Sequence, residues 1–196
     1  MFAGYVGRSY RHGQGLLLLG INPGGGGDAD RYRTTEDEEL YPLLADFKNA
    51  HSGGVVERFE SANSCFARVV QRWNLWTIFL PTLAAAGRSI GDVAYMNVVP
   101  YRTRKNNTPP IAARRLAWAR IVEPTIRLLA PQAIIALGKK ADAVVQPLNK
   151  TDVKYFCVPR TNGDRYVSEK ALGVLAGIRE SLTLDSRLSQ YKWRLP

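Results

Sequence analysis

Polar and glycine-rich segments stand at the ends of four short apolar runs of the sequence. The segment GINPG at residues 20–24 follows the first run, Asn97 lies within the second, and Gly138 and Arg160 follow the third and fourth. A side-chain amide can orient a water molecule through its carbonyl, or pair with a polar ligand through both its donor and its acceptor, and a guanidinium is a permanent cation. The candidate functional groups are therefore amides and a cation at the ends of buried segments.

The cysteines and histidines do not form a metal-binding pattern. There are two of each, at Cys65, Cys157, His12 and His51, and they lie far apart, whereas a structural zinc ion or an iron-sulfur cluster needs four ligands. The chain also lacks a compact cluster of Asp or His residues for catalytic metals. We expect no metal, no cofactor and two reduced thiols, with a single disulfide as the alternative.

The elements that must position these groups follow from the apolar pattern. The four runs predict buried strands at residues 16–21, 93–99, 133–137 and 153–158. Helical spacing lies between them at residues 36–48, 61–76, 111–129 and 139–145, and Ser168 is a candidate N-cap for a last helix. This alternation predicts an α/β fold with a doubly wound, four-stranded, mainly parallel sheet flanked by helices. Ligands bind such sheets beyond the carboxyl ends of the strands, where the candidate groups stand.

Length and charge restrict the class of protein. The 196 residues suit a single domain spanning residues 1–196, and no apolar run approaches the roughly 20 residues of a membrane span. No signal-peptide pattern opens the chain, so we expect a cytoplasmic protein without membrane contact. The 27 Lys and Arg residues against 17 Asp and Glu give a net charge of +10, which favours a polyanionic partner such as DNA. A basic surface without a ligand is the alternative.

The four strand ends read LLLLGINPGGGG, AYMNVVPYRT, AIIALGKKA and VPRTNGDRY. The first resembles the water-activating Gly-x-Asn-Pro-Gly motif of the uracil-DNA glycosylase superfamily, as found in its mismatch-specific and single-strand-selective branches. The second is similar to the central strand of that superfamily, which ends in a base-reading Asn, and the third to its next strand and helix. The fourth stands where these enzymes carry a His-Pro-Ser or Asn-Pro-Ser loop. The resemblance covers residues 15–166 and implies the same fold and the hydrolysis of an N-glycosidic bond in DNA.

The resemblance implies that Asn22 positions the attacking water molecule and that the loop around Asn22 binds the DNA base. Cleavage of an N-glycosidic bond passes through an oxocarbenium-like sugar, and an amide carbonyl can orient a water molecule toward such a cation. Asp28 is the alternative general base if the glycine loop folds back, and a strand-capping turn is the alternative role of Asn22. The loop residues that would line the base pocket are Gly20, Ile21, Pro23, Gly24 and Gly25.

Asn97 and Arg160 complete the implied active site. The amide of Asn97 would read the edge of a flipped pyrimidine, or it is a buried Asn bonded to the backbone. Arg160 stands where the superfamily has His or Asn, although a shift of two residues would put Asn162 there. Its cation would stabilise the anionic base as it leaves, or contact a phosphate. Because Arg160 differs from the superfamily's residue, the resemblance predicts neither the base that is excised nor the rate of excision.

The glycine run at residues 24–27 has no side chain to exclude substituents at C5 of a pyrimidine, whereas the strictly uracil-selective enzymes carry a Tyr there. The alternatives are a flexible loop or a backbone nest for a phosphate. An aromatic side chain should stack on the base, and the candidates are Tyr32, Phe59 and Phe66; the apolar stripe around Phe66 favours a core position.

The segments that follow the second, third and fourth predicted strands carry side chains suited to contacting DNA. Lys139 and Lys140 fit contact with phosphate or solvent better than a nucleophilic role. The predicted DNA-binding residues are Arg102, Arg104, Lys105, Lys139, Thr161, Asn162, Arg165 and Tyr166. Together these features predict a monomeric, monofunctional DNA glycosylase. It would flip out uracil or a 5-substituted pyrimidine, for base-excision repair or for defence against modified foreign DNA. A catalytically weak nucleic-acid-binding module on the same fold and a phosphate-ester hydrolase are the alternatives.

Overall fold

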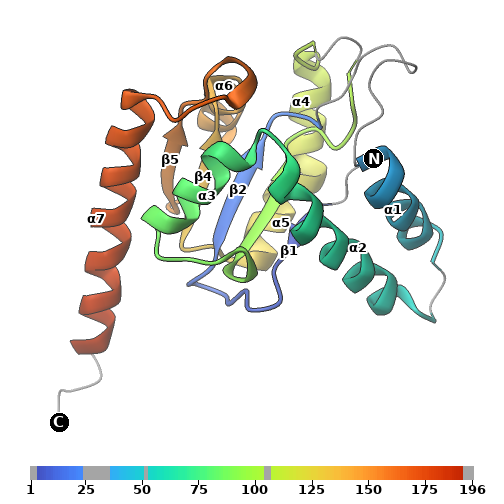
Figure 1. Ribbon diagram of the computed structural model, residues 1–196, viewed down its shortest axis with the longest axis horizontal. Helices are drawn as coiled ribbons and strands as arrows, with labels where there is room; N and C mark the ends of the chain where they lie inside the picture. Colours follow the sequence, from blue (N-terminus) through green and yellow to red (C-terminus); the bar gives the residue numbers. More distant parts are fainter. Residues whose placement is uncertain (1–3, 24–35, 51–52, 104–106, 192–196) are drawn as a thin grey trace.

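The computed structural model describes residues 4–23, 36–50, 53–103 and 107–191 (Figure 1). They form an α/β structure around one five-stranded sheet with the strand order β1-β3-β2-β4-β5. The strands are β1 (Tyr5–Val6), β2 (Leu16–Gly20), β3 (Val93–Asn97), β4 (Ala133–Leu137) and β5 (Lys154–Val158). The four predicted strands are confirmed and run parallel, whereas β1 was not predicted and pairs antiparallel with β3 at the edge.

The sheet is covered on both faces, which explains why its strands are continuous apolar runs. In β2, Leu16 and Leu18 pack into one hydrophobic cluster, whereas Leu17 and Leu19 pack into another on the opposite face. All four leucines are fully buried. A strand buried on both faces shows no alternation of polar and apolar residues, and parallel strands are typically of this kind.

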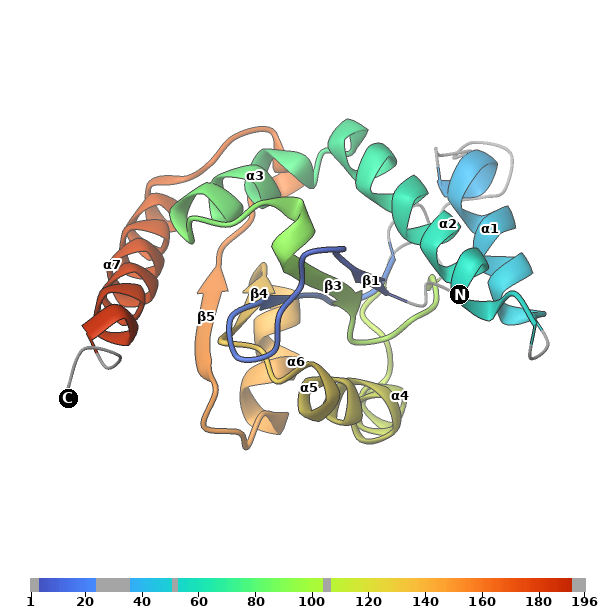
Figure 2. The same ribbon diagram turned by 90° about the horizontal axis from the view of Figure 1, so that it is seen from below.

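The helices divide between these two faces, as Figure 2 shows. One face carries α1 (Tyr41–Lys48), α2 (Val55–Val69), α3 (Trp76–Ala85) and α7 (Glu169–Tyr191). The other carries α4 (Ile111–Ala117), α5 (Glu123–Leu129) and α6 (Lys139–Leu148). The described residues also include short 3-10 or π-helical segments: η1 (Glu36–Leu40), η2 (Val70–Arg72), η3 (Ile90–Asp92), η5 (Trp118–Val122) and η6 (Asn162–Asp164). Within the described ranges, no helix is both long and apolar enough to cross a membrane.

The predicted helices are confirmed, with differences in their extent and regularity. The helix predicted at residues 36–48 begins with the π-helical segment η1, and the helix predicted at residues 139–145 extends to Leu148. The helix predicted at residues 61–76 begins earlier, at Val55, and ends at Val69, and α3 follows it as a separate helix. The long helix at residues 111–129 contains the π-helical turn η5 just before Pro124. Proline has no backbone N–H to donate, and the wider turn accommodates that loss without ending the helix.

The parallel strands bring their carboxyl ends to one edge of the sheet, which we call the carboxyl edge. The pairing of β2 and β3 continues one step beyond the strands, where the Val98 and Val99 amides donate to the carbonyls of Gly20 and Ile21 at 2.8 and 2.9 Å. At the other side of this edge, the Gly138 amide donates to Val158. The loops that leave this edge are therefore anchored by backbone hydrogen bonds at their first residues.

Candidate functional site

Gly20 and Asn97 are paired at the ends of β2 and β3, and the side chain of Asn97 occupies the space above the glycine. A Cβ atom at position 20 would lie 2.4 Å from Asn97 Oδ1 and 2.9 Å from the Tyr95 hydroxyl. Any side chain at this position would clash with both groups. Glycine is therefore required here so that two polar groups can approach the strand end.

The amide of Asn97 is buried and bonded to another side chain. It is 4% exposed, and its Oδ1 accepts a hydrogen bond from the Tyr95 hydroxyl at 3.3 Å. Tyr95 lies two residues earlier on the same strand, so both side chains project from the same face of the sheet. Its ring packs between Phe66 and Phe79. The alternative interpretation of Asn97 was a buried amide bonded to the backbone. This contact differs from it, because the partner is a side chain.

Buried polar residues gather at this edge. Among the residues that the structure describes, three polar or charged residues are buried: Thr82, Asn97 and Asp164. The Thr82 hydroxyl donates to the Ile78 carbonyl within its own helix, an ordinary local contact. The other two lie beside the strand ends. Because the burial of a polar group is unfavourable unless it is hydrogen-bonded, their presence needs a specific explanation.

Asp164 holds the guanidinium of Arg160. Arg160 Nε donates to Asp164 Oδ1 at 2.8 Å, and Nη2 donates to Oδ2. The turn η6 brings the carboxylate back toward the arginine because Gly163 and Asp164 both adopt left-handed backbone conformations, with φ of 71° and 51°. The aliphatic part of Arg160 lies against Gly138, whose Cβ would be 3.1 Å from Arg160 Cδ.

The environment keeps Arg160 charged. Its side chain is 34% exposed. Burial by itself lowers the pKa of the guanidinium, but the hydrogen bonds and charge of Asp164, with a contribution from Tyr95, outweigh burial and raise it. The two bonds to Asp164 use Nε and Nη2, which leaves the Nη1 hydrogens outside this pair. Arg160 is therefore a fixed cation whose charge is largely balanced by one carboxylate.

Asn22 joins the loop after β2 to the loop after β3. Its Nδ2 donates to Thr103 Oγ1 at 3.1 Å and to the Pro23 carbonyl at 3.4 Å. Thr103 Oγ1 in turn donates to the Asn107 carbonyl at 2.5 Å. With Nδ2 engaged, the amide keeps its carbonyl oxygen as an acceptor, the group needed to orient a water molecule. The same bond to Thr103 also gives Asn22 a structural role.

Phe66 cannot stack on a base. Its side chain is 1% exposed, and its ring stacks on Tyr5 at 4.7 Å and on Tyr95 at 5.5 Å. The prediction that Phe66 contacts the base is therefore wrong. The alternative, a core position indicated by the apolar stripe around Phe66, is confirmed. Phe59 is half-buried and packs on Phe47, where α1 and α2 meet.

Several predicted DNA-binding side chains are exposed near the carboxyl edge. Lys139 and Lys140 occupy the first turn of α6, immediately after Gly138, and both are exposed. Cations at a helix N-terminus oppose the helix dipole, so helix stability does not explain them. Arg165 and Tyr166 are also exposed, and Tyr166 is held through its carbonyl, which accepts a 3.0 Å bond from Thr161 Oγ1.

Arg102 has a different environment, because its guanidinium lies over the ring of Tyr41 in α1, 4.8 Å from the ring centre. Such a cation–π contact favours one position of the charge. The remaining predicted site residues lie outside the described residues: Gly24, Gly25, Asp28, Tyr32, Arg104 and Lys105. The side chain of Asn162 is also outside the described part of the chain, although η6 includes its backbone.

The two thiols are not activated for catalysis, because burial raises the pKa of each. Both cysteines are free, as predicted, and burial, with the Asp142 carboxylate, raises the pKa of Cys157 to about 11, so this thiol is not activated. Within the described ranges, no group of three His, Cys, Asp or Glu residues is placed to bind a metal.

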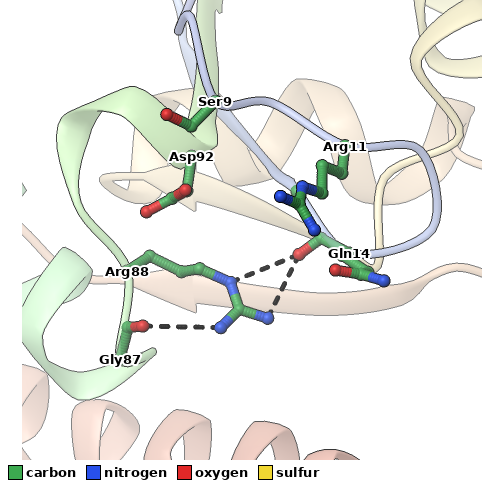
Figure 3. Close-up of a pocket in the computed structure, with 7 residues that line it drawn as sticks. Ser9, Arg11, Gln14, Gly87, Arg88 and Asp92 are labelled. Carbon is green, nitrogen blue, oxygen red and sulfur yellow. Dashed lines mark hydrogen bonds between the residues drawn. The ribbon is translucent and has the colours of Figure 1, made fainter.

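An open pocket of about 250 Å³ lies at the amino-terminal edge of the sheet (Figure 3). Its residues are Ser9, Arg11, Gln14, Gly15, Gly87, Arg88 and Asp92. The Arg88 guanidinium is bonded to the Gln14 and Gly87 carbonyls and to Gln132 Oε1. This arginine therefore links the segments that enter β2, β3 and β4, which is a structural role.

Compared with models of known protein families and with curated proteins, the sequence has no significant match. The site must therefore be interpreted from its own geometry.

Proposed function

We propose that the protein is a monofunctional DNA glycosylase with the fold of the uracil-DNA glycosylase superfamily. The observation that carries this proposal is the convergence of Asn97 and Arg160 at the carboxyl edge, each lying over a glycine, Gly20 or Gly138, that leaves room for it. Asn22 leaves the same edge in the loop after β2. One water-orienting amide, one buried amide and one fixed cation are the groups that this reaction requires.

The proposed mechanism assigns one task to each group. The base departs from the sugar as an anion while positive charge develops on the sugar ring, so the site must place a water molecule on one side and stabilise an anion on the other. The carbonyl of Asn22 orients the water. Asn97 binds the polar edge of the flipped base, and Arg160 stabilises its negative charge. Asp28 remains the alternative general base.

The contact with Asp164 supports a role for Arg160 at the base rather than at a phosphate. A flexible, unpaired cation suits a phosphate, whereas Arg160 is held by two hydrogen bonds and its charge is largely balanced. A preorganised donor needs no rearrangement when negative charge develops, which is the property that stabilises a transition state.

DNA is the proposed partner because positive charge is exposed beside the site. Lys139, Lys140 and Arg165 stand near the carboxyl edge in a chain of net charge +10. Such residues supply affinity for phosphates that does not depend on sequence. The glycine run at residues 24–27 supports acceptance of pyrimidines with a substituent at C5, because glycines offer no side chain to exclude it.

One observation favours the second candidate, a nucleic-acid-binding module with little activity. Arg160 replaces the His or Asn of the superfamily and is already bound to a carboxylate. If that carboxylate neutralises too much of the positive charge of Arg160, the site binds a flipped base without cleaving its N-glycosidic bond.

The test is an excision assay on DNA duplexes that carry uracil, 5-hydroxymethyluracil, hypoxanthine or a hypermodified cytosine. Purified protein is incubated with each duplex in EDTA, which suppresses contaminating metal-dependent nucleases, and alkali then cleaves any abasic site. We expect release of the free base and an alkali-dependent strand break with at least one pyrimidine. Binding without release on every duplex would support the module, and neither binding nor release would contradict both.

A further inference from the structure

The side-chain amide of Asn97 has a defined orientation. Its Oδ1 faces Gly20 and accepts the hydrogen bond of the Tyr95 hydroxyl. An amide turned by half a rotation would place Nδ2 at that point instead, and the two orientations present opposite hydrogen-bonding groups to a ligand. Whatever holds the amide in one orientation therefore decides which ligand edge Asn97 can bind.

The Tyr95 hydroxyl distinguishes the two orientations. It has one hydrogen, which it donates to Oδ1 in the observed orientation, and it would have to accept from Nδ2 in the rotated one. Arg160 interacts electrostatically with Tyr95, and a guanidinium carries donors only, so it cannot accept the hydroxyl hydrogen. Asn97 Oδ1 does accept it. The observed orientation is therefore the favoured one.

Asp164 keeps the cation in this place. Its buried carboxylate binds the guanidinium through two hydrogen bonds, and the aliphatic part of Arg160 packs on Gly138. Polar interactions thus run from Asp164 through Arg160 and Tyr95 to Asn97. In the described part of the chain, no residue accepts a hydrogen bond from Asn97 Nδ2, so its hydrogens remain for a ligand.

We propose that Tyr95 is a positioning residue that fixes the Asn97 amide with Oδ1 toward the protein and Nδ2 toward the ligand, so that the site selects an edge carrying a hydrogen-bond acceptor. For the ligand to be a base, this inference rests on the proposed function. Position 4 of a pyrimidine is a carbonyl acceptor in uracil and its derivatives, and an amino donor in cytosine. Nδ2 can donate to the carbonyl, whereas the amino group would oppose it donor to donor. A site built around one hydrogen-bonding pattern rejects the opposite pattern strongly.

Tyr5 is a matched control for the hydroxyl of Tyr95. Both tyrosines are buried and stack on the same Phe66, and the Tyr5 hydroxyl also makes one hydrogen bond, to the Ile90 carbonyl at 3.0 Å. Tyr5→Phe therefore removes the same atom with a similar loss of stability, but it does not touch Asn97. If Tyr95 only packs in the core, Tyr95→Phe and Tyr5→Phe should have the same effect on the orientation of the Asn97 amide.

Nuclear magnetic resonance tests the orientation without any assay of activity. In the wild type we expect at most a weak nuclear Overhauser effect between the Asn97 side-chain amide hydrogens and the Gly20 α-hydrogens, because Oδ1 faces the glycine and Nδ2 faces away from it. The effect should become stronger in Tyr95→Phe, where the amide is free to rotate, and stay unchanged in Tyr5→Phe. An effect of equal strength in the wild type and in Tyr95→Phe would overturn the proposal.

Excision rates test the consequence for selectivity. The substrates are duplexes with 5-hydroxymethyluracil or 5-hydroxymethylcytosine, which share the 5-substituent and differ in the carbonyl or amino group at position 4 and, with it, in the hydrogen on N3. The ratio of their single-turnover rates should fall by about tenfold or more in Tyr95→Phe and by less than about twofold in Tyr5→Phe. Asn97→Asp should move the preference toward the amino-bearing base, since a carboxylate only accepts.

The two proposals fail in different ways. If the wild type releases no base from any duplex, the proposed function is wrong, while the Overhauser contacts still decide whether Tyr95 orients the amide. If the wild type is active and Tyr95→Phe keeps both its rate ratio and its contact pattern, the positioning role is wrong and the proposed function stands.

Discussion

Two side-chain amides at the carboxyl edge are each bound to the protein through one polar atom, and through opposite ones. Asn22 donates from Nδ2 to Thr103, so its carbonyl remains as an acceptor. Asn97 accepts at Oδ1 from Tyr95, so its Nδ2 hydrogens remain as donors. An acceptor suits the polarisation of a water molecule, and a donor suits the carbonyl edge of a base. One kind of side chain thus presents opposite hydrogen-bonding groups because its neighbours orient it differently.

At the residue scale, Asn22→Ala should abolish base excision and change DNA affinity by no more than a few-fold. The substitution removes the carbonyl that orients the water and touches no phosphate-binding residue. Single-turnover rates and binding to a uracil duplex measure the two effects separately. Thr103→Val is the control for loop position, because it removes only the hydroxyl that Asn22 binds. A near-normal rate in Asn22→Ala, or an equal loss in Thr103→Val, would make Asn22 a structural residue.

The sequence was sufficient to place Asn22, Asn97 and Arg160 at the strand ends, because each is a polar residue in or directly after an apolar run. It did not reveal the partners that orient them. Thr103 and Asp164 lie in loops, and nothing in their local sequence predicts which strand end they contact. Tyr95 carried a usable signal, since residues two apart on a strand share a face, but a tyrosine in a buried strand is also an ordinary core residue.

At the scale of elements, the four long strands could be predicted because a strand covered on both faces is an uninterrupted apolar run. The two-residue strand β1 has no such signal, and only its pairing with β3 defines it. The first turns of α2 were missed because Val55, Val56 and Glu57 are all exposed there, so this part of the helix has no buried stripe. Helix boundaries of this kind depend on contacts that lie far away in sequence.

The capping box at η3 fixes the entry to β3, and it gives a prediction about stability. The Ser89 backbone and hydroxyl donate to Asp92 at 2.8 and 2.6 Å, and these bonds lower the pKa of Asp92. Asp92→Ala should reduce the free energy of unfolding by about 1 kcal/mol at neutral pH. A lowered folded-state pKa means that this stabilisation is present above the unfolded value of about 3.9 and is lost as the pH falls through the folded value. Urea unfolding of both proteins across this range measures the difference, and a constant difference at all pH values would contradict the prediction.

The glycine run at residues 24–27 lies outside the described residues, and a substitution there tests whether it opens the base pocket. Gly25→Tyr should suppress excision of 5-substituted pyrimidines far more than that of uracil. Overpacking a formed pocket costs about 1–3 kcal/mol, which corresponds to roughly 5- to 150-fold in rate, and only the larger base meets the new ring. A phosphate-binding nest predicts instead an equal loss on both bases with a changed salt dependence. Single-turnover rates on both substrates at two salt concentrations separate these cases.

At the scale of the whole molecule, the two edges of the sheet have different roles. The amino-terminal edge is held together by Arg88, whose hydrogen bonds connect the segments before three strands. The carboxyl edge carries the two amides, the fixed cation and the exposed lysines of α6. In parallel sheets the edge beyond the carboxyl ends is the usual place for ligands, and here the buried polar groups gather on that side as well. Under the proposed function, the exposed lysines of this edge are therefore the cations expected to contact DNA.

Replacing Lys139 and Lys140 together by Gln tests that orientation of the molecule on DNA. If both lysines contact phosphates, the slope of the logarithm of the binding constant against the logarithm of salt concentration should become shallower by about 2. The relative rates on different bases should not change, because phosphate contacts carry no information about the base. Arg127→Gln is the control, which removes one charge: Arg127 is an exposed cation near the end of α5, paired with Glu123 at 2.6 Å, and α5 leads toward the amino-terminal edge. Fluorescence anisotropy at several salt concentrations measures the slopes. A change in Arg127→Gln half as large as in the double variant, in proportion to the charge removed, would mean that DNA senses only the overall charge. A change confined to Arg127→Gln would place DNA on the opposite edge.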